Sequence, residues 1–216
     1  LAEAGPRADA ADLLYAPTFT EDWSRGDARN RGEIGIDHWR DTIEQWILWQ
    51  LPQTSGGLWR RQALERLGGW DEQAPCCQEH ELYLRAIMAG MQLELTPSPG
   101  AVYRVWSERT LCRSNPRLTI AERGKLIERM LAWLDTSGRS RREYTRAAGR
   151  AFFEMARTLA NLDLDEGANY HAAYRRRGLI SLRRSPAAPL AYRLVYRLAG
   201  FRNAERLAAA RRSTQA

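Results

Sequence analysis

The sequence predicts an α/β protein whose C-terminal region is entirely helical. Short apolar runs that alternate with polar residues or end at turn residues indicate strands in the first half of the chain. From about residue 117 onward, apolar residues recur at the spacing of an amphipathic helix instead. One such stripe consists of Tyr144, Ala148, Phe152, Met155 and Leu159.

The individual elements of the first half follow from these patterns. Strands are expected at 11–15, 55–59, 93–95 and 101–105, and helices at 38–50, 61–67 and 78–89. Gly68 and Gly90 follow the last two helices, where glycine adopts the left-handed cap conformation at no steric cost. Residues 20–37 are rich in Gly, Asp, Asn and Arg and lack periodicity, so we expect a loop there.

The second half is divided by helix-start signals. Asp165 is expected to cap a helix that ends at Gly178. Ser185 and Pro186 indicate the start of another helix, because proline at the first helical position loses no hydrogen bond. Asn203 marks the start of a last short helix.

Length and composition limit the class of protein. A chain of 216 residues with 44% hydrophobic residues has room for one domain and an appendage. No window of 18 uninterrupted apolar residues occurs, so no membrane-spanning helix is expected. Cys76, Cys77 and Cys112 are an odd number with two adjacent thiols, which favours a reducing cytoplasm over a disulfide framework.

The positive charge is concentrated at the C-terminal end. Residues 138–216 carry a net charge of +11, whereas residues 1–137 carry −4. A basic tail of this kind suggests an anionic partner, such as a membrane surface or nucleic acid. The alternative is a set of solvated helix faces in an arginine-rich proteome, which the ratio of 32 Arg to one Lys favours.

The composition of the helix expected from Pro186 bears on which anionic partner, a membrane surface or nucleic acid, is expected. It carries leucines and tyrosines among arginines, a mixture that suits an interfacial helix. A helix packed on the core with solvated arginines explains the same mixture and is preferred. We therefore expect no nucleic-acid partner, and keep a peripheral contact with a membrane through the basic helices as an alternative. The residues concerned are Leu190, Tyr192, Arg193, Leu194, Tyr196, Arg197 and Leu198.

Four short motifs between residues 54 and 104 carry the functional information. They read Thr-Ser-Gly-Gly-Leu-Trp-Arg-Arg from Thr54, Leu-Gly-Gly-Trp-Asp-Glu from Leu67, Cys-Gln-Glu-His-Glu-Leu from Cys77 and Val-Tyr-Arg from Val102. In order and spacing they resemble the acceptor-side half of a family 2 glycosyltransferase, over residues 11–107. The resemblance implies a partial GT-A-like sheet with flanking helices in residues 1–107, followed by a basic helical region in residues 108–216. It also implies that the nucleotide-binding half lies upstream of Leu1.

The resemblance assigns the catalytic base to Glu79, where many relatives have aspartate. A sugar hydroxyl that attacks an anomeric carbon must lose its proton, and a carboxylate within hydrogen-bond reach accepts it. In the first turn of its helix, Glu79 would be favoured in the ionised form by the helix macrodipole. Glu81 lies about 200° around the same helix and can pair with Arg85, so we interpret it as structural.

The substrate-binding residues implied by the resemblance surround the base. Gly56 and Gly57 would allow a ligand to approach the backbone closely, and Trp59 could stack on a sugar ring or base. Arg60 or Arg104 could contact the donor phosphates. Core packing of Trp59 and surface ion pairs of the two arginines are the alternatives. The full set is Thr54, Gly56, Gly57, Trp59, Arg60, Asp71 and Arg104.

Metal ligands are not assigned within this chain. The resemblance implies Mg²⁺ or Mn²⁺ bound by an Asp-any-Asp motif upstream of Leu1. Asp163-Leu164-Asp165 matches that pattern but lies between two predicted helices, where a cap is the better interpretation. A zinc site at Cys76, Cys77 and His80 is disfavoured because adjacent cysteines are poor chelators and no second pair is suitably spaced.

Together these expectations describe an inverting glycosyltransferase. It would move a sugar from a nucleotide-sugar donor to a glycan or lipid-linked acceptor, in the synthesis of cell-surface polysaccharide or another glycoconjugate. Its place would be the cytoplasm or the inner face of the membrane. A non-catalytic, acceptor-binding module and a basic protein that binds membrane surfaces remain as alternatives.

Overall fold

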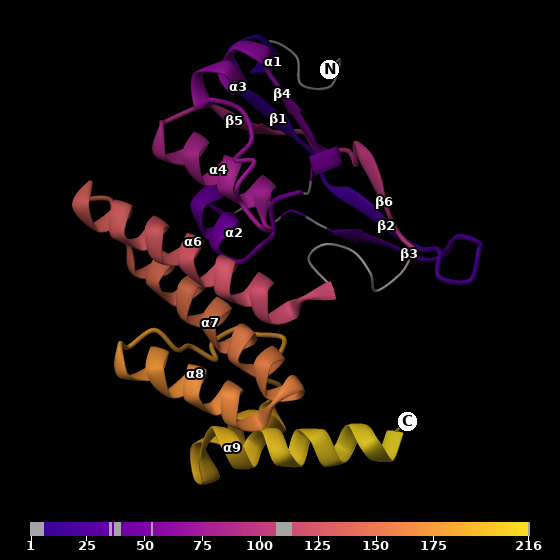
Figure 1. Cartoon of the computed structure of the whole chain (residues 1–216), viewed down its shortest axis with the longest axis vertical. Coiled ribbons are helices and arrows are strands. Elements are labelled where there is room, and N and C mark those ends of the chain that lie inside the picture. Colours follow the sequence, from indigo (N-terminus) through magenta and orange to yellow (C-terminus); the bar gives the residue numbers. More distant parts are fainter. Residues whose placement is uncertain (1–6, 35, 37–39, 53, 107–113, 216) are drawn as a thin grey trace. The chain divides into compact units, whose positions relative to one another are not determined.

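The computed structural model confirms the mixed α/β class with an all-helical C-terminal region (Figure 1). The chain forms two compact units, Leu1–Trp133 (unit 1) and Leu134–Ala216 (unit 2). The division falls inside a long helix rather than near residue 107, where the sequence analysis placed it. The structure describes residues 7–34, 36, 40–52, 54–106 and 114–215.

The first sheet of unit 1 has the order β4-β1-β5. Its strands are β1 (Leu13–Tyr15), β4 (Gly57–Trp59) and β5 (Leu93–Leu95). The central strand β1 pairs antiparallel with β4 and parallel with β5. All three strands lie within expected segments, but a single 3₁₀ turn, η1 (Thr54–Gly56), replaces the first part of the strand expected at 55–59.

The second sheet corrects the expectation of a loop at 20–37. It has the order β3-β2-β6 and consists of β2 (Thr18–Asp22), β3 (Arg29–Ile34) and β6 (Ala101–Val105). β2 and β3 form an antiparallel hairpin that projects away from the helices of unit 1 (Figure 1). The hairpin lacks a clear apolar pattern because most of its residues are not fully buried, and β2 is paired on its other side with the distant strand β6.

Four short helices complete the first part of unit 1: α1 (Arg7–Ala10), α2 (Thr42–Ile47), α3 (Arg61–Leu67) and α4 (Gln78–Met88). α2 is shorter than the expected helix at 38–50, of which Trp39 lies outside the described residues. The carboxylate of Asp41 caps its start, and the chain leaves the helix at Leu48, before Pro52. As expected, Gly68 in the left-handed conformation ends α3, and Gly90 with a positive φ follows α4.

α4 is the helix around which unit 1 is built. It contacts α2 and α3, and its residues Leu82, Tyr83 and Leu84 are almost completely buried. The indole N–H of the buried Trp46 in α2 donates a hydrogen bond to the His80 carbonyl at 2.9 Å. This packing fixes the start of α4 relative to α2.

The helical region consists of α6 (Pro116–Thr136), α7 (Arg142–Leu162), α8 (Leu164–Arg176) and α9 (Leu190–Gln215). Unit 1 ends within α6, at Trp133. α7 buries the whole predicted stripe from Tyr144 to Leu159. α8 packs closely on α7, since a Cβ added to Gly167 would lie 2.3 Å from the backbone nitrogen of Ala160.

Two predicted helix starts in unit 2 are wrong, and the start of the last helical segment is displaced. Asp163, rather than Asp165, caps α8 by accepting a hydrogen bond from the Glu166 N–H at 2.8 Å. Ser185 and Pro186 lie in turns, and the next helix begins at Leu190. Asn203 lies inside α9, which is kinked three residues earlier at Gly200 (φ 80°, ψ 177°), a backbone conformation open essentially only to glycine.

The core of unit 2 encloses a buried carboxylate. Glu205 of α9 is 3% exposed and forms a short ion pair with Arg157 of α7 at 2.5 Å. The hydroxyl of Tyr192 donates to the same carboxylate at 2.7 Å. These groups lie beside an apolar cluster that includes Phe153 and Phe201, so the charge of Glu205 is matched inside the unit.

Candidate functional site

The first turn of α4 presents the predicted base. Glu79 is its second residue and is only partly exposed. Cys77, which precedes the helix, has a left-handed backbone (φ 62°), a conformation rarely adopted by residues other than glycine. The side chain of Cys77 makes no cap hydrogen bond. The positive end of the helix dipole therefore favours negative charge at Glu79.

The structure brings Glu79 together with Thr54. The Thr54 hydroxyl donates a hydrogen bond to Glu79 Oε1 at 3.2 Å, across 25 residues of sequence. The second carboxylate oxygen, Oε2, makes no hydrogen bond to the residues that the structure describes. One oxygen of Glu79 is thus oriented and the other remains open to accept a proton.

Gly56 and Gly57 are needed for a different reason from the one expected. A Cβ on Gly56 would lie 2.6 Å from Pro52 Cβ and 2.8 Å from the Thr18 hydroxyl. On Gly57 it would lie 3.1 Å from the Tyr83 hydroxyl. The close approach at this segment is made by the protein's own atoms, which lock η1 and β4 against the start of β2 and against α4.

Tyr83 adds a buried phenol that the sequence analysis missed. Its ring centroid lies 5.8 Å from that of Trp59, so Trp59 packs partly against α4. Burial, and then the nearby charge of Glu79, raise the pKa of Tyr83 well above its usual value, so the phenol keeps its proton. The spacing of four residues from Glu79 was the available signal, because it places both side chains on one face of α4.

Arg60 is committed to the backbone rather than to a phosphate site. Its guanidinium donates to the carbonyl oxygens of Ala11 at 3.1 Å and Asp9 at 2.8 Å. The expectation that it contacts donor phosphates has no support in this geometry. These two hydrogen bonds instead hold the segment before β1 in place.

Asp71 lies in the loop between α3 and α4, where it stabilises a turn. Its carboxylate accepts a hydrogen bond from the Gln73 N–H at 3.0 Å. Arg85 of α4 anchors the start of this loop by donating to the carbonyl oxygens of Leu67 and Gly69. Among the described residues no contact joins Asp71 to Glu79, so the structure gives Asp71 a role in loop geometry.

Arg104 lies on the second sheet and belongs to a different cluster. Its guanidinium lies over the Trp23 ring at 5.1 Å and 3.8 Å from the Glu21 carboxylate. Trp23 in turn contacts Trp106, which is 59% exposed. This aromatic face was missed because it joins β2 and β6, and within the described residues it has no contact with Glu79.

Glu81 is structural, as expected. Its carboxylate accepts from Arg85 at 2.8 Å and lies 3.5 Å from Arg129 of α6. It is 7% exposed, whereas Glu79 faces the surface. The two carboxylates of α4 therefore differ in environment, and only Glu79 is open to a ligand.

His80 is buried between the two glutamates. Its ring stacks on Trp49 with centroids 3.3 Å apart, and Nε2 has no hydrogen-bond partner in the described structure. Burial, and then the charge of Arg123, hold the pKa of His80 far below its ordinary value. The imidazole stays neutral and shielded, and does not compete with Glu79 for a proton.

The described residues do not fit a bound metal ion. No group of three or more His, Cys, Asp or Glu side chains among them is placed to hold one. Cys76 and Cys77 are buried with their sulfurs 3.6 Å apart, and Cys112 lies outside the described residues. Asp163 is a helix cap and Asp165 pairs with Arg202, so both are already engaged.

No family model matches the chain, and neither the curated proteins nor the solved structures include a detectable relative.

Proposed function

We propose that the chain is the acceptor-side part of an inverting, nucleotide-sugar-dependent glycosyltransferase of the family 2 type, with Glu79 as its general base. The observation that carries the proposal is the pair formed by Glu79 and Thr54, 3.2 Å apart at the open end of α4. The motif order around this pair supports it further. The acceptor would be a hydroxyl of a glycan or of a lipid-linked sugar.

The chemistry assigned to Glu79 is a single proton transfer. The acceptor oxygen forms a bond to the anomeric carbon while the bond from that carbon to the nucleoside diphosphate breaks. The diphosphate leaves with the electron pair, and the acceptor proton passes to Glu79 Oε2. Thr54 holds the other carboxylate oxygen, so the carboxylate is oriented before the acceptor arrives.

The surroundings of Glu79 leave it as the available base. Tyr83 retains its proton because its pKa is raised, and His80 is shielded by Trp49. Glu81 is occupied by Arg85 and Arg129. A base must be accessible, and of these four side chains Glu79 is the one that is neither buried nor ion-paired within the described structure.

In this proposal the donor diphosphate and its Mg²⁺ or Mn²⁺ are held by residues other than those of the described structure. The bound ion would offset the charge of the departing diphosphate. The residues described supply the acceptor side alone: a base, its orienting hydroxyl and the half-buried Trp59. Trp59, whose ring packs near Tyr83 one turn along α4 from Glu79, would offer a surface for a sugar.

The test is a transfer assay with a matched pair of variants. The full-length protein, with the donor-binding half that the proposal requires, is incubated with Mn²⁺, a panel of radiolabelled nucleotide sugars and glycan or lipid-linked acceptors. Glu79→Gln keeps the shape of the side chain but removes its basicity, so transfer should fall by about 10²–10⁴-fold. Glu65→Gln, at an exposed position on α3, makes the same change in charge and should leave transfer unchanged.

Two results would contradict the proposal. Transfer by Glu79→Gln at the unaltered rate would remove the base from Glu79. Calorimetric binding of glycan acceptors, without transfer from any donor in the panel, would favour the non-catalytic acceptor-binding alternative. Circular dichroism of both variants verifies that the substitutions leave the fold intact.

A further inference from the structure

The first segment of α9, before the kink at Gly200, has two apolar faces. Its inward face places Tyr192 and Tyr196 against Phe153, with ring centroids 5.9 Å and 6.2 Å apart. This side packs on the core of unit 2, as the sequence analysis preferred for the whole helix. The leucines of the same segment do not take part in that packing.

These leucines form an exposed ridge along α9. Leu190, Leu194 and Leu198 are 82%, 60% and 80% exposed. Spaced four residues apart, they follow one another on one side of the helix. A single exposed leucine needs no explanation, but three in a continuous row form the kind of apolar surface that marks an interaction site.

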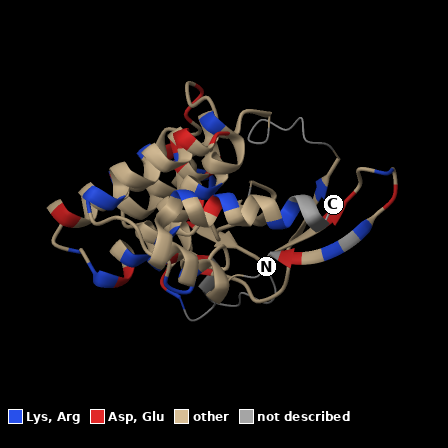
Figure 2. Cartoon of the chain, turned by 90° about the horizontal axis from the view of Figure 1, so that it is seen from below, with Lys and Arg blue, Asp and Glu red and all other residues tan. Residues whose placement is uncertain are grey.

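Positive charge borders this leucine ridge. α9 contains six arginines and one acidic residue, Glu205, which is buried and paired with Arg157. The arginines recur as blue bands along the helix that ends at the C-terminus (Figure 2). Arg197 lies next to the ridge and, like Arg206 and Arg211, is exposed and makes no hydrogen bond or ion pair with the described residues.

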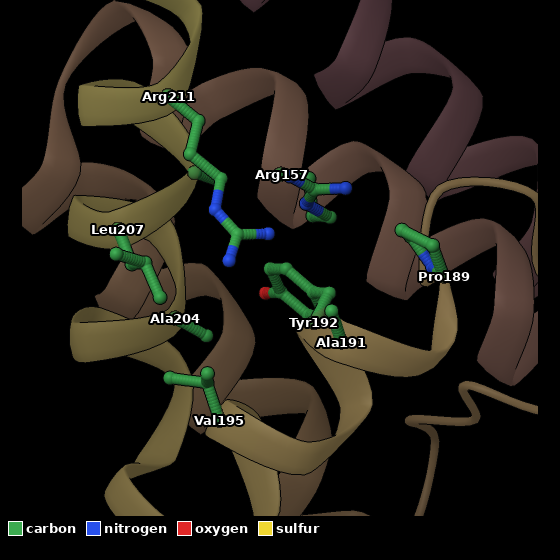
Figure 3. A pocket seen from close by; sticks show the side chains of 9 residues that line it. Arg157, Pro189, Ala191, Tyr192, Val195, Ala204, Leu207 and Arg211 are labelled. Carbon is green, nitrogen blue, oxygen red and sulfur yellow. The ribbon is translucent and has the colours of Figure 1, made fainter.

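α9 also lines a pocket, together with Arg157 of α7. It has a volume of about 160 Å³ and is lined by both segments of α9, by Val195 of the first and Leu207 of the second among others (Figure 3). The guanidinium of Arg211 extends toward Tyr192 from the second segment (Figure 3). Both segments of α9 thus carry exposed apolar and cationic side chains.

We propose that the leucine ridge and the arginines beside it bind the surface of an anionic lipid bilayer. A helix that carries leucines and arginines side by side suits the boundary between acyl chains and anionic headgroups. No helix in the described part of the chain is long and apolar enough to cross a membrane, so the contact is with one surface.

A bilayer suits this surface better than a second copy of the chain does. Two ridges facing each other would bring their arginine edges together, and like charges oppose that contact. The ridge also lacks the exposed tryptophans and tyrosines that usually form the hot spots of protein–protein interfaces, among which leucine is under-represented. Anionic headgroups match the unpaired arginines, and acyl chains match the leucines.

The inference does not use the proposed transfer reaction. Lipid binding and sugar transfer depend on different residues, so each can fail without the other. The experiment measures flotation of the full 216-residue chain with vesicles of phosphatidylcholine alone or with 30% phosphatidylglycerol. We expect binding to the anionic vesicles at low salt, weaker binding to the neutral ones, and loss of binding as salt is raised.

Two variants, each with a control, separate the apolar from the electrostatic contribution to vesicle binding. Replacing Leu190, Leu194 and Leu198 by serine should lower the fraction bound at least tenfold, whereas Leu162→Ser, an exposed leucine elsewhere, should not. Arg197→Gln with Arg211→Gln should lower binding to anionic vesicles several-fold and flatten its salt dependence. Arg142→Gln with Arg183→Gln, two exposed arginines outside α9, makes the same change in charge and should have little effect.

Three outcomes would overturn the inference. The first is absence of binding to anionic vesicles at low salt. The second is undiminished binding by the triple serine variant. The third is a dimer of the unaltered chain in light scattering, without vesicle binding, that becomes monomeric in the triple variant; this would assign the ridge to a second copy. The arginine variant changes only exposed, unpaired side chains, so it tests the inference even where the serine variant folds poorly.

Discussion

The two units of this protein differ in how they pair their buried polar groups. Unit 1 leaves the carboxylate of Glu79 open at the start of α4 and buries His80 with Nε2 unpaired among the described residues. Unit 2 pairs its buried carboxylate, Glu205, with Arg157, and bonds its buried His171 to the Tyr196 hydroxyl at 2.9 Å. Both units expose large apolar side chains, Trp106 among them in unit 1, but on α9 three exposed leucines follow one another in a row.

This difference separates two kinds of function. Left-handed backbone at Cys77, and at Trp49 (φ 63°), lies close to the open carboxylate of unit 1. Local strain and unpaired polar groups persist where the surrounding structure holds them, and they gather at sites of chemistry. Exposed apolar rows gather at surfaces that bind a partner. In the two proposals made above, unit 1 holds the reaction site and unit 2 the docking surface.

The largest expected effect comes from opening the buried ion pair of unit 2. Glu205→Ala would leave Arg157 and the Tyr192 hydroxyl without their buried partner, and we expect unit 2 to lose about 3–5 kcal/mol of stability. Glu81→Ala in unit 1 should cost less, about 1.5–3 kcal/mol, because Arg129 is half exposed and Arg85 keeps two carbonyl partners.

Urea unfolding followed by circular dichroism measures both losses. Because the two units can unfold in separate steps, each transition is fitted by itself. Glu143→Ala, at an exposed position in α7, serves as the control and should change stability by less than about 0.5 kcal/mol. Equal losses for Glu205→Ala and Glu81→Ala would break the proposed contrast between the two units.

A smaller loss of stability is expected from overpacking the close contact between α7 and α8. Gly167→Ala places a methyl group against the backbone of Ala160, so α8 must move away from α7. We expect a loss of about 1–3 kcal/mol from overpacking, although alanine is favoured over glycine in helices by about 1 kcal/mol. Asn169→Ala, at an exposed site on α8, is the matched control in the same urea titration. A gain in stability for Gly167→Ala would show that the contact between the helices is looser than described.

The third prediction concerns a contribution to stability that changes with pH only on acidification. Burial, and then the charge of Arg175, lower the pKa of His171 from 6.5 to about 4. Between these values the unfolded chain binds a proton that the folded unit resists, so stability falls as pH drops from 6.5 toward 4 and is constant for this group above 6.5.

His171→Phe isolates this contribution. The phenyl ring can keep the stacking on Phe201, whose centroid lies 4.3 Å away, but it cannot titrate. We expect a lower stability at pH 7.5, because the bond to Tyr196 is lost, and a smaller further loss at pH 4.5. Parallel pH profiles for the variant and the unaltered chain would exclude His171 as a source of the acid sensitivity of unit 2.

Local patterns predicted those elements whose signals are contained in a few adjacent residues. Gly68 ends α3 as expected because one left-handed residue decides a helix end. The apolar stripe of α7 is buried because helical periodicity reports directly on one face. The hairpin β2–β3 was not predictable in this way, since β2 is held by β6, about 80 residues further along the chain.

The residues of the candidate site, too, were predictable where their signals lie in local motifs and not where they depend on pairing between distant strands. Motif order placed Glu79 and Thr54 in one site, and the structure joins them. The separate location of Arg104, over Trp23, depends on strand pairing between β2 and β6 that no local pattern encodes. Asp163 and Asp165 both have a carboxylate that can cap a helix, so the local sequence does not decide between them. Only the path of the backbone shows that Asp163 is the cap.

The two connections between the sheets of unit 1 differ in length, which affects where the chain can tolerate insertions and deletions. β1 reaches β2 through two residues, Ala16 and Pro17, whereas β5 reaches β6 through the five residues 96–100. Leu13 pairs with Leu93 and Thr18 pairs with Ala101. The sequence separation between paired residues is therefore three residues larger in the second sheet. Residues inserted or deleted in 96–100 would be taken up there, without a slip of register in either sheet. The Gly56 carbonyl accepts a hydrogen bond from Ala16 in the shorter of these connections, so changes of chain length offer a way to reshape the surface beside Thr54 while both sheets stay intact.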